Sequence, residues 1–199
     1  MTAPALLLLV RHAWAGERGA VPDDRTRPLD DRGRHQAAAL LEHLDVALQT
    51  RGRPRLDDHR PPPVLLSSPL LRCTQTLAPM ASALGLEVVT DHRLAEVEVP
   101  LSSRDGWPDA AYLGTRAVAA LDDVMAQRPG TAALVVCAHG EILPALVGAL
   151  AGRGELVTPS PVDLTAKRLP KGATWLLDGH GGDGSPMSPR TVVELDPPA

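Results

Sequence analysis

The sequence predicts a three-layer α/β/α sandwich with a mainly parallel central sheet, built by a single domain over residues 1–199. Short apolar runs alternate with longer segments in which apolar residues recur at helical spacing, and this alternation is typical of parallel sheets covered by helices. The runs are continuously apolar, which indicates strands that are buried on both faces. A chain of 199 residues is also long enough to bury a sizeable core without disulfides or a structural metal.

Six apolar runs are expected to be the strands of this sheet. They lie at residues 5–10, 64–67, 86–89, 133–137, 174–177 and 191–195. The first run is too short to span a bilayer, and no basic residue precedes it, so we interpret it as a buried strand rather than a signal peptide. Between the last two strands, residues 179–190 are rich in glycine and are expected to form a flexible loop.

Four helices are expected between the strands. The first follows Asp30, which we expect to be its N-cap, and carries one apolar stripe along its length. The second is expected to open at Ser68-Pro69, with the serine as N-cap, and to end at Gly85. Pro79 lies inside this second helix and favours a kink or a break. Two further helices are expected around residues 118–125 and 142–150.

Charge and composition exclude several classes of function. The chain has 20 lysines and arginines against 24 aspartates and glutamates, a net charge of -4, so no overall basic field would attract nucleic acid. Its mean hydropathy of -0.05 argues against a membrane protein. Cys73 and Cys137 each lie in an apolar stretch, which suits reduced thiols in a cytoplasmic protein. Only Lys167 and Lys171 are lysines, and we attribute this arginine bias mainly to GC-rich coding.

Charged and polar side chains follow four of the predicted strands. Arg11 and His12 end the first strand, and Arg72 lies in the opening turn of the helix after the second. Glu96 follows the third strand, and His139 ends the fourth directly before a helix. Ligands of open α/β sheets bind at the carboxyl ends of the strands. Two arginines, two imidazoles and a helix N-terminus predict an anion site, most naturally for phosphate. The carboxylate could supply a proton to a leaving group. We expect no metal and no cofactor, because fixed cations already neutralise the phosphoryl oxygens.

Four motifs, in this order along the chain, resemble those of the histidine phosphatase (phosphoglycerate mutase-like) superfamily. They are the R-H-A-x-A-G segment Val10–Gly16, the helix start Arg27–Ala37, the S-S-P-x-x-R-x-x-Q-T segment Ser67–Thr76 and the strand with His-Gly at Val135–Gly140. The resemblance covers nearly the whole chain. It implies a phosphatase that hydrolyses phosphomonoesters or phosphohistidine, with His12 as the nucleophile that becomes phosphorylated. Arg11, Arg72 and His139 would bind the phosphoryl group while it is transferred.

The resemblance leaves the general acid open. Leu94-Ala95-Glu96 fits the L-x-E pattern of many members, so Glu96 is the first candidate. The G-x-W-E-G segment that usually follows is replaced by Val97–Pro100, which contains Glu98. Glu98 and Glu141 are therefore the other two candidates for the acid. A catalytically weak phosphate- or nucleotide-binding regulatory domain and a phosphomutase are the alternative functions, and the mutase is disfavoured because mutases usually carry a longer lid.

The residues that would select the substrate are candidates only. Trp14 and Arg27 lie near the predicted nucleophile in sequence, and Glu141 directly follows the His-Gly motif. A core position for Trp14 and a solvated loop position for Arg27 are the alternatives. Residues 97–115, which include Trp107, are expected to form a short lid-like insertion.

Two branches of the superfamily share features with this chain. The R-H-A-x-A-G motif resembles the SixA-type phosphohistidine phosphatases. Residues 137–144 and 171–175 resemble the histidine phosphatase domain found at the C-terminus of some bacterial Nudix hydrolases. The expected substrate is therefore a phosphorylated small molecule, a nucleotide or a phosphohistidine protein. We expect a cytoplasmic protein that binds neither nucleic acid nor membrane, and the sequence leaves its oligomeric state open.

Overall fold

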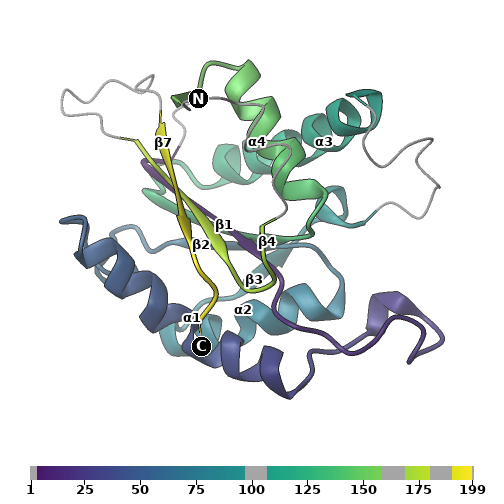
Figure 1. The fold of residues 1–199 in the computed structure, drawn as a ribbon. Coiled ribbons are helices and arrows are strands. Elements are labelled where there is room, and N and C mark those ends of the chain that lie inside the picture. The colour runs from purple at the N-terminus through teal and green to yellow at the C-terminus, as the bar shows by residue number, and fades with distance from the viewer. Residues whose placement is uncertain (1–3, 97–106, 158–168, 180–189, 199) are drawn as a thin grey trace.

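A computed structural model describes residues 4–96, 107–157, 169–179 and 190–198 of the protein. A seven-stranded sheet forms its centre, with helices α1 and α2 on one face and helices α3 and α4 on the other (Figure 1). This arrangement confirms the predicted three-layer α/β/α sandwich.

The strands occur in the sheet in the order β3-β2-β4-β1-β6-β7-β5. Their bounds are β1 Leu6–Arg11, β2 Val64–Ser67, β3 Val88–Thr90, β4 Ala133–Ala138, β5 Leu156–Val157, β6 Thr174–Asp178 and β7 Arg190–Leu195. Strands β1 to β4 are parallel, and β6 runs antiparallel to both β1 and β7. All six predicted strands are present, although β3 begins two residues after the predicted residue 86. The two-residue strand β5 was not predicted, because so short a segment carries no periodic signal.

The helices are α1 Asp31–Gln49, α2 Leu71–Leu84, α3 Trp107–Gln127 and α4 Ile142–Gly152, with 3-10 turns at Asp24–Thr26, Leu56–Asp58 and His92–Leu94. Asp30 is the N-cap of α1 as predicted, and its side chain accepts a hydrogen bond from the Gly33 N–H. Gly85 ends α2 in the left-handed conformation, with φ of 65°. The predicted N-cap of α2 is wrong, because the cap is Leu70 rather than Ser68. The helix also continues through Pro79, so the proline does not break it.

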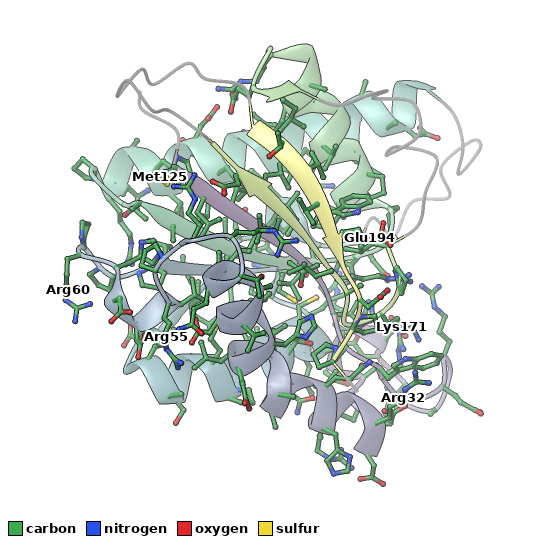
Figure 2. The ribbon with its side chains drawn as sticks, turned by 60° about the vertical axis from the view of Figure 1, so that its left-hand side comes forward. Arg32, Arg55, Arg60, Met125, Lys171 and Glu194 are labelled. Atoms are coloured by element: carbon green, nitrogen blue, oxygen red, sulfur yellow. The ribbon has the colours of Figure 1, made fainter. Side chains whose placement is uncertain are left out.

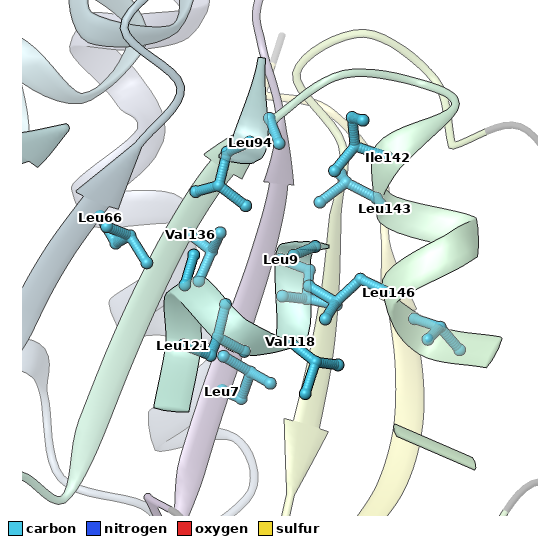
Figure 3. Close-up of a cluster of buried hydrophobic side chains, with 14 of the residues drawn as sticks. Leu7, Leu9, Leu66, Leu94, Val118, Leu121, Val136, Ile142, Leu143 and Leu146 are labelled. Atoms are coloured by element: carbon cyan, nitrogen blue, oxygen red, sulfur yellow. The ribbon is translucent and has the colours of Figure 1, made fainter. Parts of the chain in front are cut away.

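The core is aliphatic and lies on both faces of the sheet. Leu7 and Leu9 of β1 pack toward α3 and α4, as Figure 3 shows, and Leu8 and Val10 pack on the other face against α1 and α2. Successive residues of a strand point to opposite faces. A continuously apolar run is therefore what a sheet covered on both sides requires.

Two expected segments lie largely outside the described residues. Of the expected lid at 97–115, only 107–115 are described, and these residues form the start of α3. Of the expected loop at 179–190, only the two end residues are described. Within the described part of the chain, none of the helices combines the length and the apolar character that a membrane crossing needs.

Candidate active site

The carboxyl ends of the parallel strands bring four of the predicted site residues together. His12 follows β1, and His139 follows β4, the strand that pairs with β1. Arg72 comes from the first turn of α2, and Glu96 follows the turn after β3. The two histidine rings are 5.4 Å apart between centroids. One nitrogen or oxygen each of His12, Glu96 and His139 lies within 4.8 Å of the others.

His12 is buried and held as a neutral imidazole. Its Nδ1 lies 2.8 Å from the carbonyl oxygen of Ala13, so this nitrogen carries the hydrogen and donates it. The lone pair of Nε2 therefore stays available. Burial and then the nearby His139 lower the pKa of His12 most, the Ala13 bond opposes them, and Arg72 and Arg11 add smaller effects, so that the pKa falls to about 2. An imidazole in this state can act as a nucleophile at neutral pH.

The guanidinium of Arg72 is fully buried between two carboxylates. Its Nη2 donates to Glu96 Oε2 at 2.8 Å, and its Nη1 donates to the carbonyl oxygen of Asp24 at 2.9 Å. The same Nη1 also forms an ion pair with Asp24 Oδ2, at 3.3 Å. These contacts fix the orientation of the Arg72 guanidinium beside Glu96. Sequence reasoning missed Asp24, which lies in an irregular stretch without a motif.

His139 is fully buried and is the protonated member of the pair. Its Nε2 lies 2.9 Å from Ser68 Oγ and 3.6 Å from Cys73 Sγ, and its Nδ1 lies 3.4 Å from Glu96 Oε1. Burial alone would lower its pKa, but Cys73 and Glu96 outweigh this effect and raise the pKa to about 9. Ser68 therefore contacts a site residue instead of capping α2.

Glu96 lies at the centre of these cations. Besides Arg72 and His139, its carboxylate contacts the exposed Arg18, whose Nη2 is 3.4 Å from Oε1. Burial opposes ionisation, but the ion pair with His139 and the charge of Arg72 lower the pKa of Glu96 to about 2. The carboxylate of the free protein thus occupies cations that a phosphoryl group would also use.

Arg11 reaches the same edge from the end of β1. Its Nη1 donates to the carbonyl oxygen of Leu169 at 2.6 Å. A Cβ atom at Gly140 would lie 2.9 Å from Arg11 Cζ, so the guanidinium packs directly over the residue after His139. The glycine of the predicted His-Gly motif is what leaves room for this arginine.

The remaining predicted residues differ in where they lie. Arg27 is buried rather than solvated: its Nε donates to Asp24 Oδ1 at 2.7 Å and its Nη1 to the Gly16 carbonyl at 2.9 Å. It thus supports the residue that holds Arg72. Glu141 is exposed at the start of α4, and in the part of the chain that the structure describes no hydrogen bond joins it to the histidines. Glu98 lies outside the described residues.

Trp14 is half-buried and lies two residues after His12. The Arg32 guanidinium carbon is 4.6 Å from the centroid of the ring, and Lys171 Nζ is 4.3 Å from it. Sequence reasoning assigned no role to either cation.

The electrostatics of the cluster favour an anion over a metal ion. His12, Glu96 and His139 are grouped closely enough to share a metal. However, a metal would have to displace the proton of His139, whose pKa is raised to about 9, and this competition weakens metal binding at neutral pH. Arg11 and Arg72 add repulsion. The same charges attract a phosphoryl group.

Comparisons with known proteins agree with this geometry. The family model of the histidine phosphatase superfamily (branch 1) matches residues 7–110. An 8-oxo-(d)GTP phosphatase of Mycolicibacterium smegmatis is 31% identical over 179 residues, which are 89% of this chain and 45% of that protein. The chain thus spans less than half the length of this curated relative.

Solved structures share the fold at low sequence identity. A mycobacterial glucosyl-3-phosphoglycerate phosphatase aligns with a TM-score of 0.68 and 18% identity, covering 98% of this chain and 99% of the other. SixA from Agrobacterium tumefaciens aligns with a TM-score of 0.60 and 20% identity, with the same two coverages. The family model spans more than half of the chain and includes three of the four motifs. The chain therefore belongs to the histidine phosphatase superfamily (branch 1).

Proposed function

We propose that the chain is a metal-independent phosphatase that hydrolyses phosphomonoesters or phosphohistidine through a covalent phosphohistidine at His12. The observation that carries this proposal is the pairing of a neutral, buried His12 with a protonated His139 beside two arginines. A phosphoryl dianion needs the cations, and in-line attack on its phosphorus needs the uncharged imidazole.

In the first half-reaction, the lone pair of His12 Nε2 attacks phosphorus. A P–N bond forms, and the bond from phosphorus to the leaving oxygen breaks. Arg11, Arg72 and His139 neutralise the phosphoryl oxygens in the transition state. The leaving oxygen takes a proton from the general acid, for which we propose Glu96.

Binding of substrate would prepare Glu96 for this role. In the free protein its pKa is about 2, because His139 and Arg72 stabilise the carboxylate against the cost of burial. A bound phosphoryl group takes over these two partners and adds negative charge next to the carboxylate. Both changes raise a carboxyl pKa, so Glu96 would gain the proton that it then donates.

In the second half-reaction, water attacks the phosphorus of phosphohistidine. The Glu96 carboxylate now accepts a proton from the water, the P–N bond breaks, and inorganic phosphate leaves with His12 neutral again. The same residue serves as acid and then as base, as microscopic reversibility requires.

The substrate class stays a proposal among three candidates. The relatedness to an 8-oxo-(d)GTP phosphatase supports a nucleotide, and the fold shared with SixA supports a phosphohistidine protein. The fold shared with a glucosyl-3-phosphoglycerate phosphatase supports a phosphorylated small molecule. Two buried free cysteines support a cytoplasmic location, where thiols stay reduced.

The test is hydrolysis of p-nitrophenyl phosphate and of one substrate from each class by wild type, His12→Ala and the exposed control His35→Ala. We expect His12→Ala alone to lose activity. A radiolabelled phosphate donor should leave label on the wild type that is acid-labile and base-stable, as a phosphoramidate is. Hydrolysis that survives in His12→Ala would contradict the proposal. Tight phosphate binding without any turnover would support the regulatory-domain alternative instead.

A further inference from the structure

Two cations share the ring next to the nucleophile. Lys171 Nζ and Arg32 Cζ lie 4.3 Å and 4.6 Å from the centroid of the Trp14 ring. Figure 2 shows Arg32 and Lys171 on the same side of the molecule, although they come from the start of α1 and from the segment before β6. The proposed mechanism uses neither cation.

Within the part of the chain that the structure describes, no carboxylate is paired with either of these cations. Among the described residues, neither Lys171 nor Arg32 forms an ion pair, whereas Arg34, two residues further along α1, pairs with Asp31. Burial lowers the pKa of the half-buried Lys171, and the charges of Arg11 and Arg27 lower it further. Cations held close to other cations without a counter-ion are stabilised by an anion that arrives from solution.

Asp30 does not remove this surplus of positive charge. Its carboxylate acts on Lys171 in the opposite direction to the arginines, but it already accepts the Gly33 N–H at the N-terminus of α1. The pKa of Lys171 stays lowered. Arginines thus outnumber carboxylates among the charges that shift the pKa of Lys171, although the whole chain has a net charge of -4.

The backbone fixes Lys171 beside the nucleophile. Strand β6 is antiparallel to β1, so the segment that leads into β6 lies where β1 ends. The Gly172 N–H is shared between the carbonyl oxygens of Arg11 and His12, at 3.1 and 3.2 Å. A Cβ at Gly172 would lie 3.0 Å from the side chain of Gln36, which also accepts from the Trp14 N–H. Hydrogen bonds and close packing therefore hold the segment of Lys171 and the loop of Trp14 beside His12.

We propose that Lys171 and Arg32, supported by the Trp14 ring, form a second anion subsite that selects substrates whose leaving group carries its own negative charge. The shared chemistry is an anionic group next to the scissile phosphoryl group. It has two sources, the inner phosphate of a nucleoside diphosphate and the carboxylate of a phosphorylated sugar acid. This inference rests on the proposed phosphatase function.

A purely structural role would make a different prediction. Cations over a tryptophan stabilise it by cation–π attraction, and their loss would then loosen the whole site. Substitution of either cation would then weaken the binding of ligands with one and with two anionic groups equally. If the cations form a second subsite, the substitution weakens mainly the binding of the ligand with two anionic groups.

Binding is measured by calorimetry for methylphosphonate and for methylenediphosphonate, which carry one and two phosphonates and resist hydrolysis. Wild type should bind the diphosphonate more tightly. Lys171→Met and Arg32→Met should each weaken diphosphonate binding about tenfold more than methylphosphonate binding. Lys171→Arg should restore the difference, and Arg128→Met, directly after the C-terminal end of α3, should leave both affinities unchanged. This readout needs no turnover, so it is independent of the His12→Ala test.

The source of the anion is found from kcat/KM of wild type and Lys171→Met on guanosine diphosphate, 3-phosphoglycerate and p-nitrophenyl phosphate. The inference is supported if kcat/KM for either anionic substrate falls about tenfold more than for p-nitrophenyl phosphate, and that substrate identifies the source. Equal losses on all three, or equal affinity of wild type for the two phosphonates, would overturn it. If the enzyme hydrolyses these substrates but the inference is overturned, the proposed phosphatase function still stands.

Discussion

His12 and His139 have ring centroids only 5.4 Å apart, yet their pKa values move in opposite directions. Burial and neighbouring cations keep His12 neutral, whereas Cys73 and Glu96 keep the proton on His139. One histidine can therefore act as a nucleophile while the other acts as a cation. The difference lies in their contacts and not in the residue type.

This difference predicts the pH dependence of kcat/KM. His139 keeps its proton below a pH of about 9 and loses it above. For p-nitrophenyl phosphate, whose leaving group depends little on a general acid, kcat/KM should therefore be constant through neutral pH and fall as the pH rises through 9. His12, with a pKa of about 2, should add no acid limb near 6.5, the value of an ordinary histidine. The measurement is hydrolysis of p-nitrophenyl phosphate from weakly acidic to strongly basic pH, corrected for ionisation of the substrate. An enzyme pKa near 6.5 in the corrected profile would contradict the neutral state of His12.

Glu96→Gln tests the general acid. Loss of a general acid typically costs about 10²–10⁴-fold in rate, and the cost is largest when the leaving group most needs a proton. We expect that loss for an alkyl phosphate and a smaller one for p-nitrophenyl phosphate. The control is Glu141→Gln, because this residue is exposed and, in the described part of the chain, forms no hydrogen bond with the site histidines. A loss as large in the control would transfer the role to Glu141.

The sequence predicts the site residues that lie at strand ends. His12, Glu96 and His139 could be located because each follows an apolar run, and parallel strands end at one edge. Asp24 could not, because only the tertiary fold brings its loop against Arg72. Ser68 was misassigned because a serine before a helix usually caps it, and here its hydroxyl has a tertiary partner.

At the scale of elements, the start of α1 presses against the loop that carries the nucleophile. A Cβ at Gly33 would lie 1.8 Å from the carbonyl oxygen of Trp14, a backbone atom that no rotamer change can move. Gly33→Ala should therefore lower the free energy of unfolding by about 1–3 kcal/mol or more, as measured by urea denaturation. Gly152→Ala is the matched control, because no atom lies within 4 Å of its Cβ. Its stability should stay equal or rise by up to about 1 kcal/mol. Equal stability of Gly33→Ala would show that the two elements can separate freely.

A substitution in the turn between β4 and α4 should cost less stability than Gly33→Ala. A Cβ at Gly140 would meet the end of the Arg11 side chain, which can move away. Gly140→Ala should therefore keep most of its stability but lose about tenfold in phosphate affinity, which calorimetry would detect. Unchanged affinity would mean that Arg11 does not contact the bound phosphate.

The direction of β6 relative to β1 was the part of the element pattern that could not be predicted from sequence. A buried strand shows the same apolar run whether it is parallel or antiparallel to its neighbour. The sequence therefore located β6 but not its orientation, and Lys171 could not be assigned to the catalytic edge.

At the scale of the whole molecule, the net charge of -4 differs from the local charge around Lys171, where several arginines lie beside the site. Local charge steers an anionic substrate, and salt screens this attraction over about 10 Å at 0.1 M ionic strength. We expect kcat/KM for an anionic substrate to fall several-fold as NaCl rises from low to high concentration. Stopped-time assays at fixed pH would measure this, with far-UV circular dichroism to show that the fold persists. A rate that is independent of salt would mean that the overall negative charge dominates.

The position of β1 in the sheet has a consequence for synthesis of the protein. β1 is made first, but its two neighbours, β4 and β6, are made much later. The apolar segment Leu6–Val10 therefore leaves the ribosome as an unpaired strand and needs shielding from aggregation until those neighbours emerge. His12 gains His139 only after β4 has been made, and the Gly172 contact only after the segment that leads into β6 has been made. A nascent chain arrested before β6 should neither bind phosphate nor resist a protease.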